Sequence, residues 1–447
     1  MTGVPELRDR DPELRDRDPE LRDRLRRLRR DKDAPPEWLR LRLARDRAAD
    51  AQDAGERDCG PPGRLVESSN PSGAFAARVE TFAGEHVHGD WRLDEVGAVE
   101  PCAFARFVGD GSLDAVDLLH AVYLDVETTG LSGGAGTRSF LVGLGAFEDG
   151  AFRLWQGFLR SPDEEHAMLV EVAERIRASA AIVSFFGRSF DRHRLEDKMR
   201  IFDIAPPFPP LERRPHLDLY YPCARLYRPA LADGRLATME SALCGFARED
   251  DLPGSRAPAA WFDFLAGRAH RLEAVFRHNR DDVLSLVALA AHLGRVGCER
   301  RADGRRLGGP SGARAHGLAR LALARREHGA ALGWIERALA RPQAEPRALR
   351  FLRAGLLKRL GRRAAAAAQL HALAEDGDDE HALHALVELA KDAEHRRGDL
   401  RAATRACARA RALLRRNPEG HARLRRDLDR REARLRDRFQ GAEQGGR

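Results

Sequence analysis

The pattern of apolar and polar positions in the middle of the chain predicts a sheet with helices beside it. Apolar runs of strand length occupy Leu118–Val126, Ser139–Phe147 and Phe152–Leu159, with turn-forming residues between them. Asp163–Ala178 is amphipathic and has acidic residues in its first turn, which is typical of a helix start. A short apolar run at Ala181–Phe186 suits a central strand. This order of elements predicts a mixed sheet flanked by helices.

The helical pattern continues beyond this predicted sheet. We expect further helices from about Phe190, near Thr238–Phe246, and from Trp261 to about Leu293. Four prolines between residues 206 and 210 favour a loop, because proline cannot continue a helix.

From Ala313 to Arg438 the chain has a helical pattern throughout and is rich in Ala, Leu and Arg. The expected turns at Gly329, Gly361 and Gly398 are 32 and 37 residues apart. This spacing predicts degenerate helix-turn-helix repeats of the tetratricopeptide type, which stack to form a binding surface. An ordinary helical bundle is the alternative.

The first sixty residues are low in complexity. The heptad PELRDRD begins at Pro5 and Pro12, and a third, shorter copy begins at Pro19. A proline in every heptad prevents one continuous helix, and each copy offers a single large apolar residue. We interpret the segment as a disordered, charge-balanced arm; a partner-binding heptad seam is the weaker alternative.

The predicted organisation has five parts. These are a disordered arm at 1–60, a lead-in segment at 61–117, an α/β domain at 118–296, all-α helical repeats at 311–438 and a tail at 439–447.

Composition restricts the class of protein. A chain of 447 residues is expected to form two or three folded units. It has no apolar run long enough to cross a bilayer, its start lacks the apolar core of a secretory signal, and its six cysteines show no C-x-x-C spacing. We therefore expect a cytoplasmic, reduced protein without a membrane partner.

Charge is distributed unevenly along the chain. Residues 401–438 contain 14 Arg and 5 acidic residues, a net charge of +9, whereas the whole chain carries +7. Residues 120–296 contain 22 basic and 24 acidic residues. The C-terminal part, and not the predicted α/β domain, is therefore the part that could attract a nucleic-acid backbone.

Acidic residues recur at the elements of the predicted sheet. Asp125 and Glu127 are two residues apart on a strand, so both side chains point to the same side. Asp191 lies at a predicted helix start, where the unpaired backbone amides favour a carboxylate. Asp281 and Asp282 lie in a strongly helical segment and point about 100° apart, so only one of them can face the same site.

Four carboxylates in one place repel one another unless cations neutralise them. Carboxylate oxygens are the ligands that Mg²⁺ and Mn²⁺ prefer. Two such ions about 4 Å apart can activate a water and stabilise the leaving oxygen of a phosphodiester. The set therefore predicts a site for two divalent cations.

Other candidate features carry weaker signals. His86 and His88 alternate on an expected strand and could bind metal, although we interpret them as surface residues. The segment GLSGGAGT lacks the lysine of a phosphate-binding loop, so we expect a turn that leaves the strand edge open. Tyr220, Tyr221 and Tyr227 could stack bases, but such rings more often belong to a core or lid.

The order of the acidic motifs resembles the DEDD 3′–5′ exonucleases of the ribonuclease H-like fold. More narrowly, LDVETTGLSGGAGTRSFLVGLG, FFGRSFD and VFRHNRDDVLSLV resemble the YprB-type ribonuclease H-like family, over roughly residues 118–293. The resemblance implies a metal-dependent nuclease fold. It also implies a metal-binding set and a histidine that orients or deprotonates the attacking water. That set is Asp125, Glu127, Asp191 and Asp282, and the histidine is His278.

Two positions depart from the pattern of these families. Phe186 stands where many relatives have Asn, so a polar contact is expected to be missing. His278 is four residues before Asp282, a spacing typical of the subclass that carries Tyr; the His-bearing subclass generally has five. A helix-surface histidine beside an acidic neighbour is the alternative interpretation of His278.

The leading hypothesis is an enzyme that removes nucleotides from a single-stranded 3′ end with two Mg²⁺ or Mn²⁺ ions. Its helical repeats would hold the nucleic acid or recruit a protein partner. One alternative is a catalytically weak or inactive scaffold that binds nucleic acid or protein partners. Another is hydrolysis of short oligonucleotides or of a nucleotide phosphodiester. The sequence does not separate DNA from RNA, and no substrate-binding residue is predicted.

Overall fold

The computed structural model describes residues 65–107, 111–130, 136–208, 214–249, 251–269, 271–298, 307–341, 346–416 and 421–444. The predicted N-terminal arm at 1–60 and most of the glycine-rich segment, residues 131–135, lie outside these described ranges.

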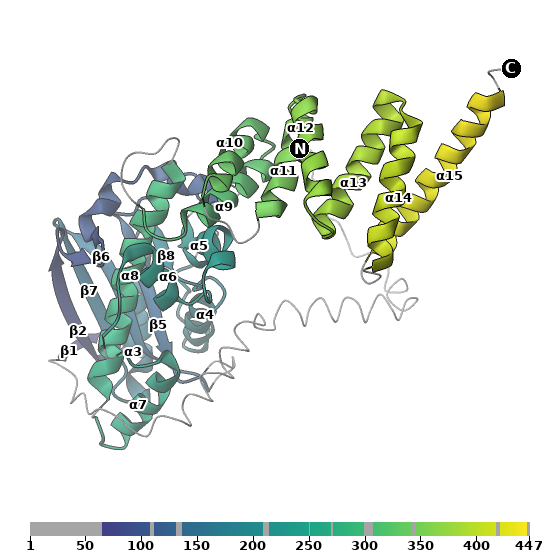
Figure 1. Ribbon diagram of the computed structural model, residues 1–447. Helices are drawn as coiled ribbons and strands as arrows, with labels where there is room; N and C mark the ends of the chain where they lie inside the picture. Colours follow the sequence, from purple (N-terminus) through teal and green to yellow (C-terminus); the bar gives the residue numbers. More distant parts are fainter. Residues whose placement is uncertain are drawn as a thin grey trace, which may run out of the picture.

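A mixed seven-stranded sheet forms the centre of the α/β part of the described chain (Figure 1). The strands are β1 (Val66–Asn70), β2 (Gly73–Ala83), β5 (Ala121–Thr128), β6 (Ser139–Glu148), β7 (Ala151–Phe158), β8 (Ala181–Ser184) and β9 (His216–Asp218). Their order is β1-β2-β7-β6-β5-β8-β9. The pairs from β1 to β5 are antiparallel, whereas β8 is parallel to both β5 and β9. The predicted mixed sheet is confirmed.

The lead-in segment belongs to the same sheet. We expected it to precede the α/β domain, but its strands β1 and β2 extend the sheet beyond β7. Phe75, Ala76 and Ala77 of β2 are buried in the core of the domain, and this burial ties the segment to the sheet. A boundary at residue 118 would therefore divide one sheet.

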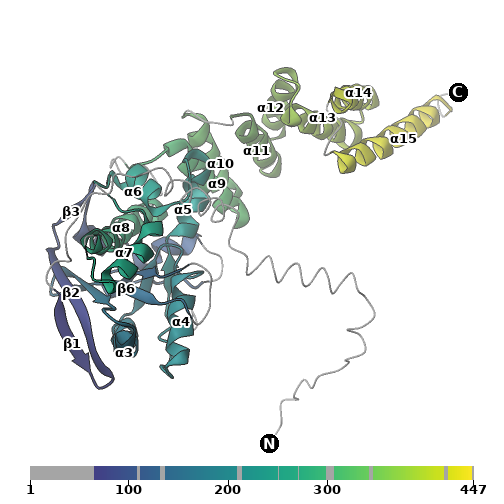
Figure 2. The same cartoon turned by 90° about the horizontal axis from the view of Figure 1, so that it is seen from below.

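Helices cover both faces of this sheet (Figure 2). They are α3 (Glu165–Arg177), α4 (Asp191–Ile201), α5 (Tyr220–Tyr227), α6 (Leu236–Cys244), α7 (Ala257–Leu265) and α8 (Leu272–Cys298). Alternate residues of β5 enter different cores: Ala121 and Tyr123 pack with the C-terminal half of α8, and Val122, Leu124 and Val126 pack with α3. Because side chains alternate along a strand, Asp125 and Glu127 lie on the same face as Ala121 and Tyr123, which is the face that α8 covers.

Two predicted elements end earlier than expected. The helical pattern from Trp261 is divided into α7 and α8, because Gly267 takes a left-handed backbone (φ +80°) just after α7 ends. The strand predicted at Ala181–Phe186 ends at Ser184, and Phe186 itself is left-handed (φ +63°). A residue in that conformation cannot continue a strand.

The C-terminal part of the described chain is a row of helices. They are α9 (Ser311–Ala324), α10 (His328–Leu339), α11 (Pro346–Arg359), α12 (Arg363–Glu375), α13 (Glu380–Asp392), α14 (Leu400–Arg416) and α15 (Ala422–Gln444). Each helix packs against the next. The first helices of three successive pairs begin at residues 311, 346 and 380, so the pairs are 35 and 34 residues apart. The last helix continues past residue 438, where we expected the tail to begin.

Two of the three predicted turns lie at their glycines. Gly361 and Gly398 have left-handed backbones (φ +78° and +65°) between paired helices. Gly329, in contrast, lies inside α10. The turn before it uses Arg326 (φ +62°), and the amide of Glu327 closes it by donating to the carbonyl of Ala322.

The row of helices is attached directly to the α/β domain. Gly317 of α9 lies so close to α5 that an added Cβ would be 2.8 Å from the Cα of Leu226. Such an approach requires glycine. None of the helices in the described ranges combines the length and the apolar character that a membrane crossing requires.

Asp379 connects two neighbouring helix pairs. Its carboxylate accepts a hydrogen bond from the amide of Ala382 (2.9 Å), which caps α13, and another from Arg347 Nη2 of α11 (2.9 Å). The hydrogen bond from Arg347 is the main reason that the pKa of Asp379 lies below its ordinary value. An aspartate with a lowered pKa stabilises the fold at pH values above its unfolded pKa, and this contribution is lost as the pH falls through the folded pKa.

We therefore expect Asp379→Ala to lower the free energy of unfolding at pH 7 by about 1–2 kcal/mol, the typical cost of losing a helix cap. The difference from the parent should shrink as the pH falls below about 4. Urea unfolding of the full chain, followed by circular dichroism, measures both. The control is Asp376→Ala, whose carboxylate is 3.7 Å from Arg350 at an exposed position and should contribute less than about 1 kcal/mol. Equal losses in the two variants would contradict the capping role.

Candidate metal centre

β5 presents two of the predicted metal-binding residues. Asp125 and Glu127 leave the face of the sheet that α8 covers. The pairing of β5 with β6 is irregular here, because Glu127 lies opposite Leu141 whereas Thr128 lies opposite Ser139. Such a bulge changes the direction in which the strand presents its side chains, and bulges are frequent beside functional sites.

Asp191 enters the site as the first residue of α4. The loop that leads to it is tight, since the amide of Arg192 donates to the carbonyl of Gly187 (2.9 Å). A Cβ on Gly187 would lie 2.5 Å from Ser184 Oγ and 3.0 Å from the carboxylate of Asp191, so only glycine fits.

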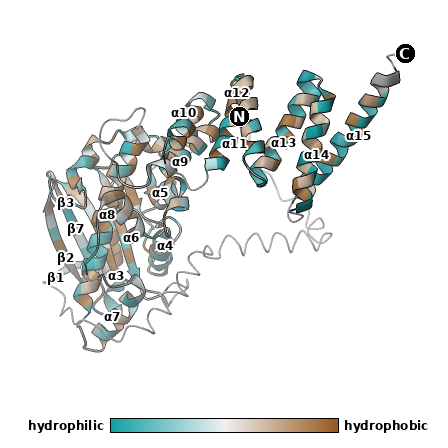
Figure 3. Cartoon of the chain, viewed as in Figure 1, coloured by the Kyte–Doolittle hydropathy of each residue, from teal (hydrophilic) through white to brown (hydrophobic). Residues whose placement is uncertain are grey.

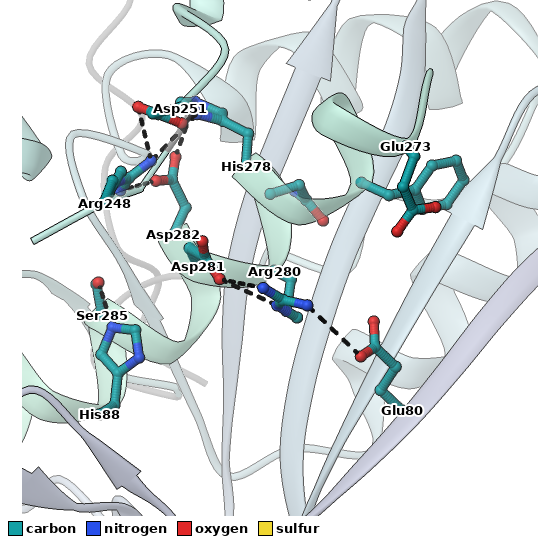
Figure 4. A network of polar contacts seen from close by, with 12 residues as sticks. Glu80, His88, Arg248, Asp251, Glu273, His278, Arg280, Asp281, Asp282 and Ser285 are labelled. Atoms are coloured by element: carbon teal, nitrogen blue, oxygen red, sulfur yellow. Dashed lines mark hydrogen bonds and ion pairs between the residues drawn. The ribbon is translucent and has the colours of Figure 1, made fainter. Parts of the chain in front are cut away.

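α8 supplies the remaining predicted residues. His278 and Asp282 are one turn apart, and the Nε2 atom of His278 is 3.8 Å from Glu127 Oε1 and 3.7 Å from Asp282 Oδ2. Ligand atoms of these three residues all lie within 4.8 Å of one another. Asp281 instead accepts a hydrogen bond from Arg280 Nε (3.0 Å), and Figure 4 shows it directed away from Asp282. As the helical geometry predicts, only one of the two aspartates faces the site.

Burial and the neighbouring carboxylates raise the pKa of Asp125 and of Asp191. Asp125 is half-buried as a whole residue, but its carboxylate is surrounded by protein. This burial is the largest reason that its pKa is well above the ordinary value, and the charges of Asp282, Glu127 and Asp191 raise the pKa further. The pKa of Asp191 is also raised, first by burial and then by Asp218, Glu127 and Asp282. Each negative charge here destabilises its neighbours, so the site favours cations.

His278 carries a positive charge at neutral pH. Burial lowers its pKa, but the nearby carboxylates of Asp282, Asp251 and Glu127 outweigh burial and raise it to about 10. Its Nδ1 atom is 2.7 Å from Asp251 Oδ1 and 3.1 Å from Arg248 Nη1. Because the ring is protonated, Nδ1 donates to Asp251, and Nε2 faces Glu127 and Asp282.

Sequence reasoning missed the group that anchors Asp282. Arg248 forms an ion pair with Asp282 and a bidentate pair with Glu240 (2.5 and 2.9 Å), and Figure 4 shows it facing both Asp282 and Asp251. The side chains of Arg248 and Glu240 are 7% and 1% exposed. A buried bidentate pair has a fixed geometry, so it holds the guanidinium against Asp282. Nothing in the local sequence of these residues indicates the contact, which joins positions 34 residues apart.

A second missed group fixes Asp125. The side-chain amide of Asn279 donates to Asp125 Oδ2 (2.7 Å), and its oxygen accepts from Gln156 Nε2 (2.8 Å). Asn279 and Gln156 are fully buried. Gly143 lies opposite both Asp125 and Gln156 in the sheet, and a Cβ there would be 2.3 Å from Asn279 Oδ1. The glycine therefore leaves the space that the amide occupies.

Asp218 fixes the loop before Asp191. Its carboxylate accepts hydrogen bonds from the amides of Phe186 (2.7 Å), Arg188 (3.1 Å) and Tyr220 (3.1 Å). Burial raises the pKa of Asp218 to about 6, and these hydrogen bonds oppose the rise. They hold Phe186 left-handed, a conformation that costs a bulky residue about 1–3 kcal/mol. Phe186 therefore differs from asparagine in backbone preference as well as in polarity.

The two histidines of the lead-in segment have different surroundings. Only Val87 and His88 of that segment form the short strand β3, so His86 does not share a strand face with His88. His88 is 4% exposed, in contrast to the surface position that we expected, and its Nε2 atom is 2.8 Å from Ser285 Oγ. The stacking of its ring on Phe246 accounts for the burial.

The residues of the centre fit divalent cations. Carboxylates whose pKa values are raised by mutual repulsion are stabilised as anions when a cation binds. Glu127, His278 and Asp282 bring two carboxylate oxygens and one ring nitrogen close together, and carboxylate oxygens are the ligands that Mg²⁺ and Mn²⁺ prefer. With the imidazole held by Asp251 through Nδ1, Nε2 is the nitrogen that faces the site.

Comparison with known proteins agrees with this architecture. Residues 122–294 match the family described as RNase_H superfamily. The chain is also 27% identical over 277 residues to the "Uncharacterized protein YprB" of Bacillus subtilis (strain 168). That match covers 62% of this chain and 65% of the relative, which is less than two thirds of the relative's length. Together with the mixed sheet, these matches give the α/β domain a ribonuclease H-like fold.

The contact between Gly143 and Asn279 can be tested by one methyl group. Gly143→Ala should lower the free energy of unfolding by about 1–3 kcal/mol, because the added Cβ would displace a fully buried and hydrogen-bonded amide. Gly333→Ala is the matched control. This glycine is exposed within α10 with no atom within 4 Å of an added Cβ, so alanine should stabilise the helix by up to about 1 kcal/mol.

Urea unfolding of both variants measures these opposite changes. A Gly143→Ala protein as stable as the parent would show that Asn279 is not confined as the geometry indicates.

Proposed function

We propose that this protein is a metal-dependent nuclease that removes nucleotides from the 3′ end of a single-stranded nucleic acid. The observation that carries the proposal is the meeting of four carboxylates from β5, α4 and α8 near the C-terminal end of β5, an inner strand of a ribonuclease H-like sheet. The direction of cleavage and the preference for single strands rest on the resemblance to DEDD exonucleases.

Asp125, Glu127, Asp191 and Asp282 would hold two divalent ions, Mg²⁺ or Mn²⁺. When bound, such ions activate a water and stabilise the leaving oxygen of a phosphodiester. The protein contributes fixed ligand positions. Asn279 orients Asp125, Arg248 orients Asp282, and the start of α4 orients Asp191. Supporting contacts of this kind hold the metal ligands within the narrow range of positions that catalysis needs.

His278 would handle the proton of the attacking water at its Nε2 atom. The atom faces Glu127 and Asp282, while Asp251 holds the other side of the ring. An imidazolium cannot accept a proton, so the base role requires a neutral ring. Positive charge bound to Glu127 and Asp282 would cancel two of the causes that raise the pKa of His278. The ring can therefore reach the neutral form in the loaded site.

The helix pairs of the C-terminal row would be tetratricopeptide-like repeats that hold the nucleic acid. Their spacing of 35 and 34 residues and their packing of each helix on the next support this interpretation. Figure 3 shows that α15 is largely hydrophilic. Exposed arginines of this helix, Arg423, Arg426 and Arg430, recur at the spacing of one helix face. They are suited to phosphate groups.

Neighbouring aspartates provide a sharp test of the metal centre. Asp282→Asn should reduce cleavage of 5′-labelled single-stranded DNA or RNA at least about 100-fold, because it removes a metal ligand. Asp281→Asn should change the rate little, since Asp281 faces Arg280 outside the site. A ladder that shortens from the 3′ end with Mn²⁺ or Mg²⁺, and not with chelator, would identify the exonuclease and its preferred sugar.

Metal binding can be measured separately from activity. Mn²⁺ should raise the melting temperature of the wild type and of Asp281→Asn, but much less that of Asp282→Asn. If Mn²⁺ raises the melting temperature but the wild type cleaves neither DNA nor RNA, the protein is a metal-binding scaffold. If the Asp281→Asn variant loses activity as fully as Asp282→Asn, our assignment of the site is wrong.

The arginine face of α15 predicts a salt dependence. Replacing Arg423, Arg426 and Arg430 with Gln should weaken binding of a labelled single strand and flatten the slope of log K against log salt by about 2, if each contacts a phosphate. Fluorescence anisotropy with the Asp125→Asn protein measures binding without turnover. Arg153→Gln, an exposed arginine that pairs with Glu148 on the sheet, is the control and should leave the slope unchanged. An unchanged slope in the triple variant would remove α15 from the binding surface.

A further inference from the structure

Phe186 is held in a backbone conformation that its side chain disfavours. Its φ angle of +63° lies in the left-handed region, which bulky residues rarely adopt. The carboxylate of Asp218, only 3% exposed, fixes it by accepting from the amides of Phe186 and Arg188. Strain that the surroundings impose in this way concentrates at functional sites, where a side chain must point in a particular direction.

The ring of Phe186 belongs to a small aromatic group that runs from the buried Tyr220 (6% exposed) to the exposed Tyr221. It meets Tyr220 edge to face (ring centroids 5.0 Å apart, planes at 77°), and Tyr220 meets Tyr221 in the same manner (5.4 Å, 77°). Phe186 is half-buried, and Tyr221 is 36% exposed with its hydroxyl 2.7 Å from Ser189 Oγ. Tyr220 also meets Phe185 edge to face (5.7 Å, 86°), and Phe185 packs against a core cluster, whereas within the described residues neither Phe186 nor Tyr221 joins such a cluster. Filling the core therefore explains Tyr220 but not Phe186 and Tyr221.

The aromatic group lies beside the metal centre. Gly187, the residue after Phe186, approaches the carboxylate of Asp191 so closely that an added Cβ would be 3.0 Å from it. Asp218, which binds the Phe186 amide, also acts electrostatically on Asp191. A nucleotide whose phosphate lies at the carboxylates would thus have its base within reach of this loop.

We propose that Phe186, supported by Tyr220 and Tyr221, is a stacking platform for an unpaired base of the substrate. The proposal rests on the proposed function, because it places the base next to a phosphate at the metal centre. Aromatic rings bind any base through its π face, so the platform would favour single strands without reading their sequence. The ring thus takes a role in substrate binding at a position where many relatives have asparagine.

Phe186→Asn separates stacking from folding. Asparagine tolerates the left-handed backbone, so the variant should melt at the same temperature as its parent or higher. In the Asp125→Asn background, the Kd for 5′-fluorescein-labelled decathymidylate with Mn²⁺ should rise about 5- to 100-fold, the range expected for one lost base stack. An otherwise identical oligonucleotide with abasic sites at its 3′ end should bind the parent as weakly as it binds the variant. Phe262→Asn is the control, since Phe262 is a 54% exposed ring on α7, and its Kd should not change.

Two results would overturn the proposal. One is an unchanged Kd for decathymidylate in Phe186→Asn. The other is a loss of affinity that is equally large for the intact and the abasic oligonucleotide. Cleavage by the wild type is scored separately. If binding depends on the base but the wild type does not cleave, the stacking platform stands and the exonuclease activity is wrong. If the wild type cleaves but binding does not depend on the base, the exonuclease activity stands and the stacking platform is wrong.

Discussion

The repulsion among the carboxylates at the end of β5 is the constraint to which the rest of the site responds. Asp125 and Asp191 both have raised pKa values, because burial and neighbouring negative charges act in the same direction. Positive or polar groups compensate from every side: Arg248 pairs with Asp282, His278 faces Glu127, and the amide of Asn279 donates to Asp125. A protein without a use for cations would gain by losing one of these carboxylates.

This compensation extends beyond the residues that contact the carboxylates directly. Arg248 is fixed by Glu240, whose carboxylate is also hydrogen-bonded to Ser285, and Ser285 meets His88 of the lead-in segment. Burial, and then the charge of Arg248, lower the pKa of His88 to about 3, so the ring is neutral and adds no further positive charge. The segment before residue 118 is therefore part of the domain in two senses, because it extends the sheet and supports the residues around Asp282.

Periodic features of the site could be predicted from the sequence, and folded loops could not. The two-residue spacing of Asp125 and Glu127 placed both on one face. Helical geometry allowed only one of Asp281 and Asp282 to face the site, and the family resemblance selected Asp282. Arg248 and Asp218 had no such signal, because their partners are 34 and 32 residues away along the chain. Phe186 was misassigned to a strand for the same reason. A carboxylate that is distant in sequence, and not local propensity, sets its backbone.

The short segment from β9 to α5 joins three parts of the molecule. β9 ends at Asp218, which holds the loop before Asp191, and α5 begins with the tyrosines that support Phe186. The same helix packs against α9, where Gly317 lies close to the backbone of Leu226. Because packed interfaces of this kind resist small displacements, α5 fixes the start of the helical row relative to the loop of the metal centre. A nucleic-acid strand bound along the row of C-terminal helices would therefore approach the metal centre from a direction that α5 determines.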